Sequence, residues 1–304
     1  MAVSLSTLEW LESRIALEQS RHTLTLEDYK RAAYAYVVIL VLLCAATLAV
    51  FGAGKERKLA RELAVKAKEA PGGGEDAIKS RALAEEASKA EKRAMKRLSW
   101  GLSCFNSALL TAMGGVYCFV LVRKSGFALT LHDLQNTNNI SGLTCLWFAL
   151  FNATDLIFGT LFYPKQMDPL TAYVHHPLYI YIMFACSTGT YGFWWSASKQ
   201  SLVAASGAPF SSSFMLSCLE ELPTLILGVG SVVPALRSDM GFGASFFVLR
   251  IVYHGFLMSQ SLYVRVDPIQ SGLFGLTMIM HLFWFKGWVV SMLGKSAQPK
   301  TKRQ

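Results

Sequence analysis

Charged residues are scarce in this chain, and their scarcity excludes an ordinary soluble domain. Asp, Glu, Lys and Arg make up 16% of its 304 residues, whereas a soluble domain is about a quarter charged. Hydrophobic residues make up 53%, and the mean hydropathy is +0.36. Many of them form runs of about 20 residues, the length that a helix needs to cross about 30 Å of hydrocarbon. Because backbone polar groups cannot stay unpaired in lipid, the sequence predicts an all-α membrane protein.

Cysteine is also scarce, and its placement argues against the usual cysteine-based sites. The six cysteines all lie within apolar runs, without a CxxC motif or a Cys/His ligand spacing. We therefore expect buried thiols rather than disulfides or a zinc site, and we predict no metal and no cofactor. A cleavable signal peptide is not expected either, because the first 30 residues contain five acidic residues and no apolar core.

The net charge of +9 is concentrated in two segments, and their position argues against nucleic-acid binding. Lys55–Arg97 holds thirteen Lys and Arg against eight Asp and Glu, which leaves +5. Lys295–Gln304 adds four basic residues and no acid, so the two segments account for the whole excess. Both flank apolar runs, where basic residues set membrane topology and contact anionic lipids. We therefore predict no nucleic-acid partner.

Seven apolar segments are long enough to span a bilayer. They are Ala33–Phe51, Leu98–Val122, Ile140–Phe162, Pro177–Ala197, Phe210–Val233, Phe242–Val264 and Ile269–Leu293. The fifth is the weakest by hydropathy, because it contains Glu220, Glu221 and Pro223. The sequence thus predicts a polytopic protein with seven crossings.

The two basic segments predict one orientation. Lys and Arg favour the cytosolic side, so Lys55–Arg97 is expected there and the N-terminus on the opposite side. Seven crossings then return the basic tail to the cytosol as well. In that tail Lys300 and Lys302 lie at the spacing of the KxKxx signal for retrieval to the endoplasmic reticulum, which must be cytosolic to work. We therefore predict a multi-pass protein of the endoplasmic reticulum membrane with a cytosolic C-terminus.

These features divide the chain into five parts. They are an amphipathic N-terminal segment (1–32), a first transmembrane helix (33–54), a charged cytosolic segment (55–97), a unit of six spans (98–293) and a basic tail (294–304). The charged segment is rich in helix-favouring Ala, Glu, Lys, Arg and Leu, but a Pro-Gly-Gly-Gly run at 71–74 must break it. We expect a helical hairpin, either a solvated linker or a surface that binds a partner.

Several ionisable groups fall inside the predicted spans, and each requires an explanation. A charge at the centre of a span costs about 2.5–3.5 kcal/mol on the insertion scale. The groups are Asp155 in the third span, His175 and His176 at the start of the fourth, Glu220 and Glu221 in the fifth, Arg250 and His254 in the sixth, and His281 and Lys286 in the seventh. Such residues are candidates for a functional site.

Helical spacing brings some of these groups together. Arg250 and His254 are four residues apart, so they share one face. Glu220 and Glu221 are about 100° apart around their helix, so at most one can face the interior squarely. A glutamate that paired with Arg250 would neutralise both charges. His254, one turn along, would complete a Glu–Arg–His cluster.

A polar pocket beside a kink is expected in the fifth span. Pro223 leaves the carbonyl of Leu219 without its helical partner, and Thr224 is placed to join either glutamate. A purely structural reading also stands, because ion pairs inside membranes often only fix helix packing. The same alternative applies to Asp155, which can hydrogen-bond a neighbouring helix, and to His281.

Three blocks of sequence resemble the TLC-domain family, which includes ceramide synthases and the translocating-chain-associated membrane protein. The first, Asp155–Tyr179, reads DLIFGTLFYPKQMDPLTAYVHHPLY and carries the His-His pair. The second, Cys218–Gly228, is similar to the family's acidic-x-[S/P]-T segment, and the third, Arg237–His254, to its R-I-x-[Y/F]-H segment. The resemblance covers residues 98–293. It implies a six-helix bundle or barrel around a cavity open to lipid, with the first span and the charged hairpin as additions.

The resemblance implies two functions. The first is lipid handling, meaning sensing, transport or regulation of membrane lipids, with a lipid or acyl chain contacting Glu220, Glu221, Thr224, Arg250, His254 and His281. The alternative is an acyl-CoA-dependent acyltransferase, in which His175 or His176 acts as base or acyl acceptor and Asp155 orients it. The sequence after His176 lacks the His-Asp and later Asp of the ceramide synthase signature. A seven-span receptor is a third alternative, but no receptor motif in the sequence supports it.

Overall fold

All regular structure is helical in the part of the chain that the computed structural model describes, namely residue 13 and residues 25–52, 55–69, 75–135, 138–188, 211–266 and 268–297. The predicted all-α class is therefore confirmed for these residues. Six helical segments are long and apolar enough to cross a membrane: Glu27–Phe51, Ala77–Ser125, Leu131–Phe162, Ser211–Val232, Asp239–Tyr263 and Gln270–Gly294. The chain is thus a multi-pass membrane protein.

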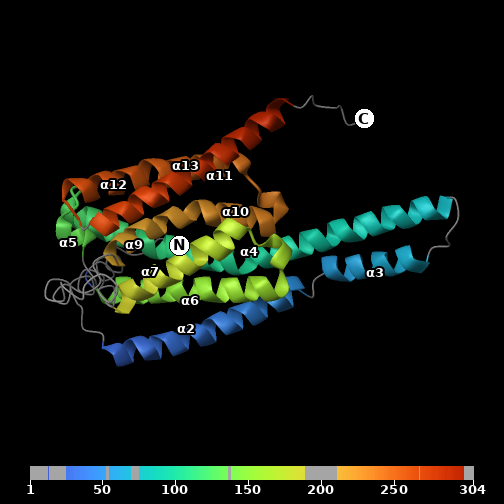
Figure 1. Cartoon of the computed structure of the whole chain (residues 1–304), viewed down its shortest axis with the longest axis horizontal. Helices are drawn as coiled ribbons and strands as arrows, with labels where there is room; N and C mark the ends of the chain where they lie inside the picture. The colour runs from blue at the N-terminus through green and yellow to red at the C-terminus, as the bar shows by residue number, and fades with distance from the viewer. Residues whose placement is uncertain are drawn as a thin grey trace.

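The six segments correspond to six of the seven predicted spans. The predicted fourth span, Pro177–Ala197, begins in α7 (His176–Thr188), and its remaining residues lie outside the described part of the chain. Most of the amphipathic segment 1–32 and the tail from residue 298 also lie outside it. In Figure 1, α7 runs beside α6 from one end of the bundle towards the other.

The other helices follow in an up-and-down order (Figure 1). They are α2 (Leu26–Thr47), α3 (Lys55–Glu69), α4 (Glu75–Ser125), α5 (Leu131–Leu134), α6 (Asn139–Phe162), α9 (Ser211–Ser217), α10 (Leu222–Val232), α11 (Asp239–Phe246), α12 (His254–Tyr263) and α13 (Pro268–Ala297). Wider π-helical turns at Leu48–Gly52, Thr171–His175 and Phe247–Tyr253 adjoin α2, α7 and α11, respectively. Short 3-10 turns lie at Pro164–Gln166, Cys218–Glu221 and Pro234–Leu236.

Side chains cap the first turn of α2 and of α6. At α2, the Thr25 hydroxyl accepts from the Asp28 N–H, while the Asp28 carboxylate accepts from the Thr25 N–H. At α6, Asn138 and Ser141 make the same reciprocal pair. Such boxes satisfy backbone donors that the first turn leaves unpaired, so they fix where each helix starts.

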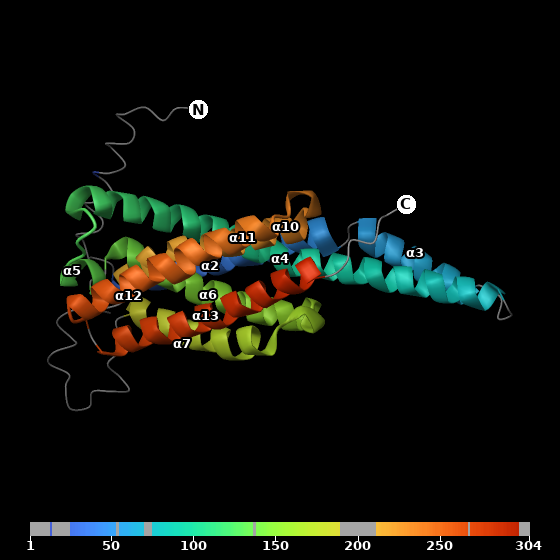
Figure 2. The ribbon, with the colours of Figure 1, turned by 90° about the horizontal axis from the view of Figure 1, so that it is seen from above.

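The charged segment forms two packed helices that project from the bundle (Figures 1 and 2). Buried side chains of Ala60, Leu63, Ala87 and Ala90 lie along α3 and α4, and the Ser80 hydroxyl donates to the Ala67 carbonyl at 2.6 Å. The second arm is not separate from the second span. Both belong to α4, which at 51 residues is about 75 Å long. No proline interrupts it, so the helix continues through the boundary that we predicted near residue 97.

The hairpin and the end of α13 lie at the same end of the bundle (Figures 1 and 2). The hairpin carries one basic segment, and α13 leads into the other. The predicted topology requires both to be on one side of the membrane, and this arrangement is compatible with that requirement. Short α5 lies at the opposite end, between α4 and α6.

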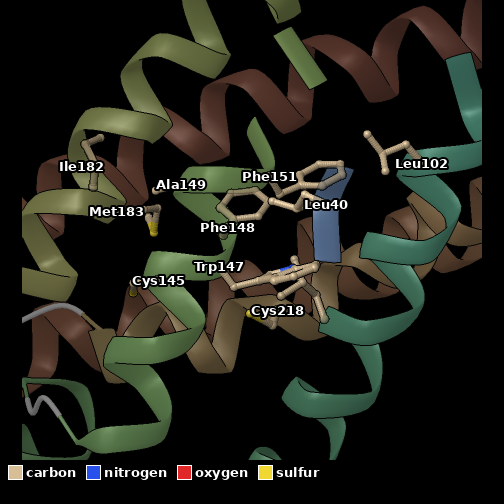
Figure 3. Close-up of a cluster of buried hydrophobic side chains, with 11 residues drawn as sticks. Leu40, Leu102, Cys145, Trp147, Phe148, Ala149, Phe151, Ile182, Met183 and Cys218 are labelled. Atoms are coloured by element: carbon tan, nitrogen blue, oxygen red, sulfur yellow. The ribbon is translucent and has the colours of Figure 1, made fainter. Parts of the chain in front are cut away.

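A cluster of buried hydrophobic side chains lies where α6 meets α2, α4 and α7 (Figure 3). Trp147 anchors it, because its indole Nε1 donates to Asn106 Oδ1 of α4 at 2.9 Å. Phe148 and Phe151 are stacked, with ring centroids 6.4 Å apart. The cluster positions one wall of the cavity described next.

Candidate functional site

A cavity of about 460 Å³ lies among the spanning helices. Its walls come from α4, α6, α7, the fifth and sixth spans and α13. Nine of the ten candidate residues predicted from the sequence line it: Asp155, His175, His176, Glu220, Glu221, Thr224, Arg250, His254 and His281. Lys286 is exposed and does not line the cavity, as expected for a side chain near a helix end that reaches towards the interface.

The fifth span is broken at the cavity, where α9 gives way to the 3-10 turn Cys218–Glu221 before α10 begins. Pro223 occupies the first turn of α10, where its missing N–H is tolerated. The Leu219 carbonyl, which we predicted to be free, accepts from the Leu222 N–H in the tighter 3-10 pattern. The break therefore costs little backbone hydrogen bonding, and it turns two adjacent glutamates towards the cavity.

Close contact with α4 positions this turn. A Cβ on Gly114 of α4 would lie 2.6 Å from the backbone nitrogen of Leu219 and 2.9 Å from the carbonyl carbon of Cys218. Real side chains do not approach backbone atoms so closely, so only glycine allows the two elements to pack in this way. Gly114 thereby fixes the distance between α4 and the glutamate turn.

Glu220 is held between two histidines. Its Oε1 lies 2.9 Å from His254 Nδ1, and its Oε2 lies 3.0 Å from His281 Nε2. His254 Nε2 in turn lies 3.0 Å from the Phe274 carbonyl oxygen. All three side chains are buried, with relative exposures of 5% for Glu220, 1% for His254 and 4% for His281. Three different spans thus converge on one carboxylate.

Glu221 faces a different partner. Arg250 Nη2 lies 3.4 Å from Glu221 Oε1 and 2.8 Å from the Thr224 hydroxyl, and Arg250 Nε donates to the Glu220 carbonyl at 2.9 Å. The Ser107 hydroxyl of α4 donates to Glu221 Oε2 at 3.0 Å. The guanidinium therefore donates to hydrogen-bond acceptors from one turn of the fifth span. The Glu221 carboxylate neutralises its charge in a setting of low dielectric.

The predicted Glu–Arg–His cluster is split into two. Arg250 pairs with Glu221, whereas His254 pairs with Glu220, and the Glu220 carbonyl links the two groups. We expected at most one glutamate to face the interior, but both line the cavity. That expectation was wrong because it assumed one regular helix with an interior on one side, whereas Glu220 meets the sixth and seventh spans and Glu221 meets α4.

The sixth span also departs from a regular helix at the site. Arg250 lies within the π-helical turn Phe247–Tyr253, and His254 follows it. The extra residue in a π turn widens the helix, and such turns are frequent at functional sites. Arg250 and His254 still both line the cavity, as their spacing predicted. The Arg250 guanidinium lies 5.3 Å from the centre of the Phe246 ring, which covers it.

The remaining predicted residues form a second polar group. The Tyr163 hydroxyl donates to Asp155 Oδ1 at 2.9 Å, and Asp155 Oδ2 lies 3.8 Å from His176 Nε2. The His175 ring lies 4.3 Å from that of Tyr179 and 6.1 Å from that of Trp284. The Nδ1 atoms of both histidines are buried without a hydrogen-bond partner among the described residues. Both histidine residues line the cavity.

Sequence reasoning missed the contribution of the second span. Ser103, Asn106 and Ser107 of α4 line the cavity, and Ser107 contacts Glu221. Their spacing of three and four residues places them on one helical face, which is the signal that could have identified them. Each was overlooked because a single Ser or Asn in an apolar run is common in membrane helices.

Comparisons of this chain with protein-family models, with curated proteins and with solved structures find no match. The function of the chain is therefore inferred from the cavity itself. Its chemistry combines a neutralised ion pair, a carboxylate bound by two imidazoles and a separate Asp–His pair, all beside aromatic and aliphatic side chains. Such a site can bind a molecule that is polar at one point and apolar along the rest of its length.

Proposed function

We propose that this protein handles a membrane lipid, by sensing, carrying or regulating it, in the manner of the TLC-domain proteins that its sequence resembles. The observation that carries the proposal is the cavity of about 460 Å³ among membrane-spanning helices. Ligand sites of 300–1,000 Å³ typically enclose one small molecule, with a few polar groups fixing its orientation. This volume suits one acyl chain with a compact polar group.

The lining of the cavity supports this ligand class. Phe148, Phe151, Leu178, Ile182 and Met183 supply an apolar wall from α6 and α7. Such a wall favours a hydrocarbon chain, since burial of apolar surface gives about 25 cal/mol per Å². The Glu221–Arg250 pair and the Asp155–His176 pair provide both signs of charge for a polar head group.

The resemblance to the TLC-domain family adds independent support. Its three sequence blocks, Asp155–Tyr179, Cys218–Gly228 and Arg237–His254, belong to different spans, and each contributes side chains to this cavity. A resemblance spread over three segments that meet at one site is more specific than any single block. The family assignment itself, with a six-span unit preceded by one additional span, remains part of the proposal.

The proposed location is the endoplasmic reticulum membrane, with the C-terminus in the cytosol. The common end of the hairpin and α13 supports a shared side for the two basic segments (Figure 2). Lys300 and Lys302 provide the retrieval pattern. Counting α7 as a crossing gives seven spans, which places the N-terminus on the opposite side.

Native mass spectrometry of the purified protein tests the proposal. We expect a co-purifying lipid with the wild-type chain and its loss with Glu221→Gln or Arg250→Ala, since both changes unpair charges at the cavity. Arg237→Ala is the matched control, because Arg237 pairs with Asp239 and does not line the cavity. A folded wild-type protein that carries no lipid, or equal lipid loss with Arg237→Ala, would contradict the proposal.

A second candidate function rests on the Asp155–His176 pair. A histidine beside a carboxylate within a cavity can act as a general base or accept an acyl group, as an acyl-CoA-dependent acyltransferase requires. Purified protein would then transfer a labelled acyl group from acyl-CoA to an amine or alcohol, and His176→Ala would abolish transfer without loss of folding. No turnover across a broad acceptor panel would reject this candidate.

A further inference from the structure

We propose that Glu220, His254 and His281 form a binding site for a divalent transition-metal ion, with Zn²⁺ the best match to these ligands. Each residue offers one ligand atom, and the three atoms lie within 4.8 Å of one another. Two imidazoles and one carboxylate are a known ligand set for zinc sites that keep a fourth position open. The proposal goes beyond lipid handling and does not depend on it.

The hydrogen bond of His254 to the Phe274 carbonyl leaves its Nδ1 atom able to bind a metal ion. A carbonyl oxygen only accepts, so the contact between His254 Nε2 and the Phe274 carbonyl requires the proton on Nε2. In the neutral ring this leaves the lone pair of Nδ1 directed at Glu220. Metal-binding histidines almost always donate their second ring N–H to a carbonyl or a carboxylate, which fixes the tautomer in this way.

The contact between His254 and Glu220 needs a positive species between its two atoms. Nδ1 and Oε1 lie 2.9 Å apart, and neither carries a hydrogen when the ring is neutral and the carboxylate is ionised. Either a proton or a metal ion can occupy that position. Tetrahedral zinc places its ligand atoms about 3.3 Å apart, so a small rotation of the side chains would admit the ion.

The charges around the site also favour a cation. Glu220 and Glu221 contribute two negative charges and Arg250 one positive charge, and all three are linked through the broken turn. With neutral histidines one negative charge remains uncompensated. A divalent ion would leave one positive charge, which selects an anionic fourth ligand from the cavity that all three residues line. Hydroxide, a carboxylate and a phosphate ester share this chemistry.

We predicted no metal from the sequence, because these three ligands follow no local pattern. Motif rules look for ligands at short, regular spacing. Here the first two ligands are 34 residues apart, and the third lies on a different span. Only the packing of the fifth, sixth and seventh spans brings them together, so no local pattern identifies them.

Metal analysis of the full-length protein tests the proposal directly. The protein is purified in detergent through a tag without histidine, loaded with Zn²⁺, desalted and measured by elemental mass spectrometry. We expect about one ion per chain, and a fall of about tenfold or more with Glu220→Gln or His254→Ala. His176→Ala is the matched control, because His176 lines the same cavity outside the three-residue site, and it should keep the ion.

Cobalt provides a second measurement that needs no variant. Co²⁺ added to the metal-free wild-type protein should give the visible absorption of a tetrahedral site, and Zn²⁺ should displace it. A folded wild-type protein that retains no zinc and gives no cobalt band would overturn the proposal and leave a hydrogen-bonded triad. Full metal retention by Glu220→Gln would overturn it as well. Lipid retention is measured separately, so either proposal can fail alone.

Discussion

Arg250 satisfies three acceptors from one turn of the fifth span. Its Nε donates to the Glu220 carbonyl, while Nη2 contacts both the Thr224 hydroxyl and the Glu221 carboxylate. This arrangement uses the rigid fork of a guanidinium, which a lysine ammonium cannot reproduce. The arginine therefore connects the sixth span to the broken turn as well as neutralising a carboxylate.

A double-mutant cycle measures the coupling between Arg250 and Glu221. Arg250→Met alone should lower the free energy of unfolding by about 1–3 kcal/mol, because it leaves the Glu221 charge and the Glu220 carbonyl without their partner. Adding Glu221→Gln should restore part of that loss, since the stranded charge is removed. Thermal unfolding in detergent provides the comparison. Strictly additive effects of the two changes would show that the pair is not coupled.

At this scale the sequence identified the residue types but not their pairing. The cost of placing a charge inside the membrane singled out nine ionisable residues, and all of them except Lys286 line one cavity. The pairing of Arg250 with Glu221 and of His254 with Glu220 depends on the 3-10 turn at Cys218–Glu221. No residue pattern in the sequence predicts that turn. His281 joined Glu220 from another span, which only packing could reveal.

At the scale of elements, the site depends on how closely α4 packs on the broken turn. Gly114 faces Leu219 and Cys218 of that turn. For its neighbour Gly115, the Leu219 side chain, 3.8 Å from an added Cβ, is the only contact within 4 Å among the described residues. The two glycines thus provide a matched pair of positions on one helix. One of them is required for the contact and the other is not.

Gly114→Ala should destabilise the protein by about 1–3 kcal/mol, the usual cost of overpacking. The methyl group would push the glutamate turn away from α4 and lengthen the contact between Ser107 and Glu221. Gly115→Ala should leave stability and lipid retention close to wild type. Unfolding temperature and lipid content of both variants are the measurements. Equal behaviour of the two would contradict the close packing described for Gly114.

The sequence predicted where the helices lie better than it predicted their irregular turns and their continuity. The third span was expected at Ile140–Phe162, and α6 covers Asn139–Phe162. By contrast, the π turn Phe247–Tyr253 and the continuity of α4 were not predicted. Apolar run length specifies where a span lies, whereas irregular turns arise from the packing of several spans.

At the scale of the whole molecule, the hairpin is an addition at one end of a bundle that holds the cavity. The end of the first span packs against α4 just beyond the hairpin. A Cβ on Gly101 of α4 would lie 2.8 Å from the Thr47 side chain and 3.0 Å from the Phe51 side chain. None of the cavity residues comes from α2 or α3. The cavity and the hairpin are thus spatially separate features.

A short flexible linker in place of residues 55–92 should therefore leave the cavity intact. Lipid and metal content per chain are expected to match the wild type, because the contacts between α3 and α4 lie outside the bundle (Figure 1). Native mass spectrometry and elemental analysis of the shortened protein provide the measurement, with the full chain as control. Loss of either ligand from a folded shortened protein would show that the hairpin supports the cavity.

A photoactivatable lipid shows whether a lipid occupies the interior cavity. Helix α6 has side chains on both sides of the comparison. Phe148 and Phe151 line the cavity, whereas Ile157 and Leu161 are 61% and 69% exposed on the outer surface. We predict crosslinks at Phe148 and Phe151 that an excess of unlabelled lipid removes. Crosslinks confined to Ile157 and Leu161, unaffected by competitor, would contradict the claim.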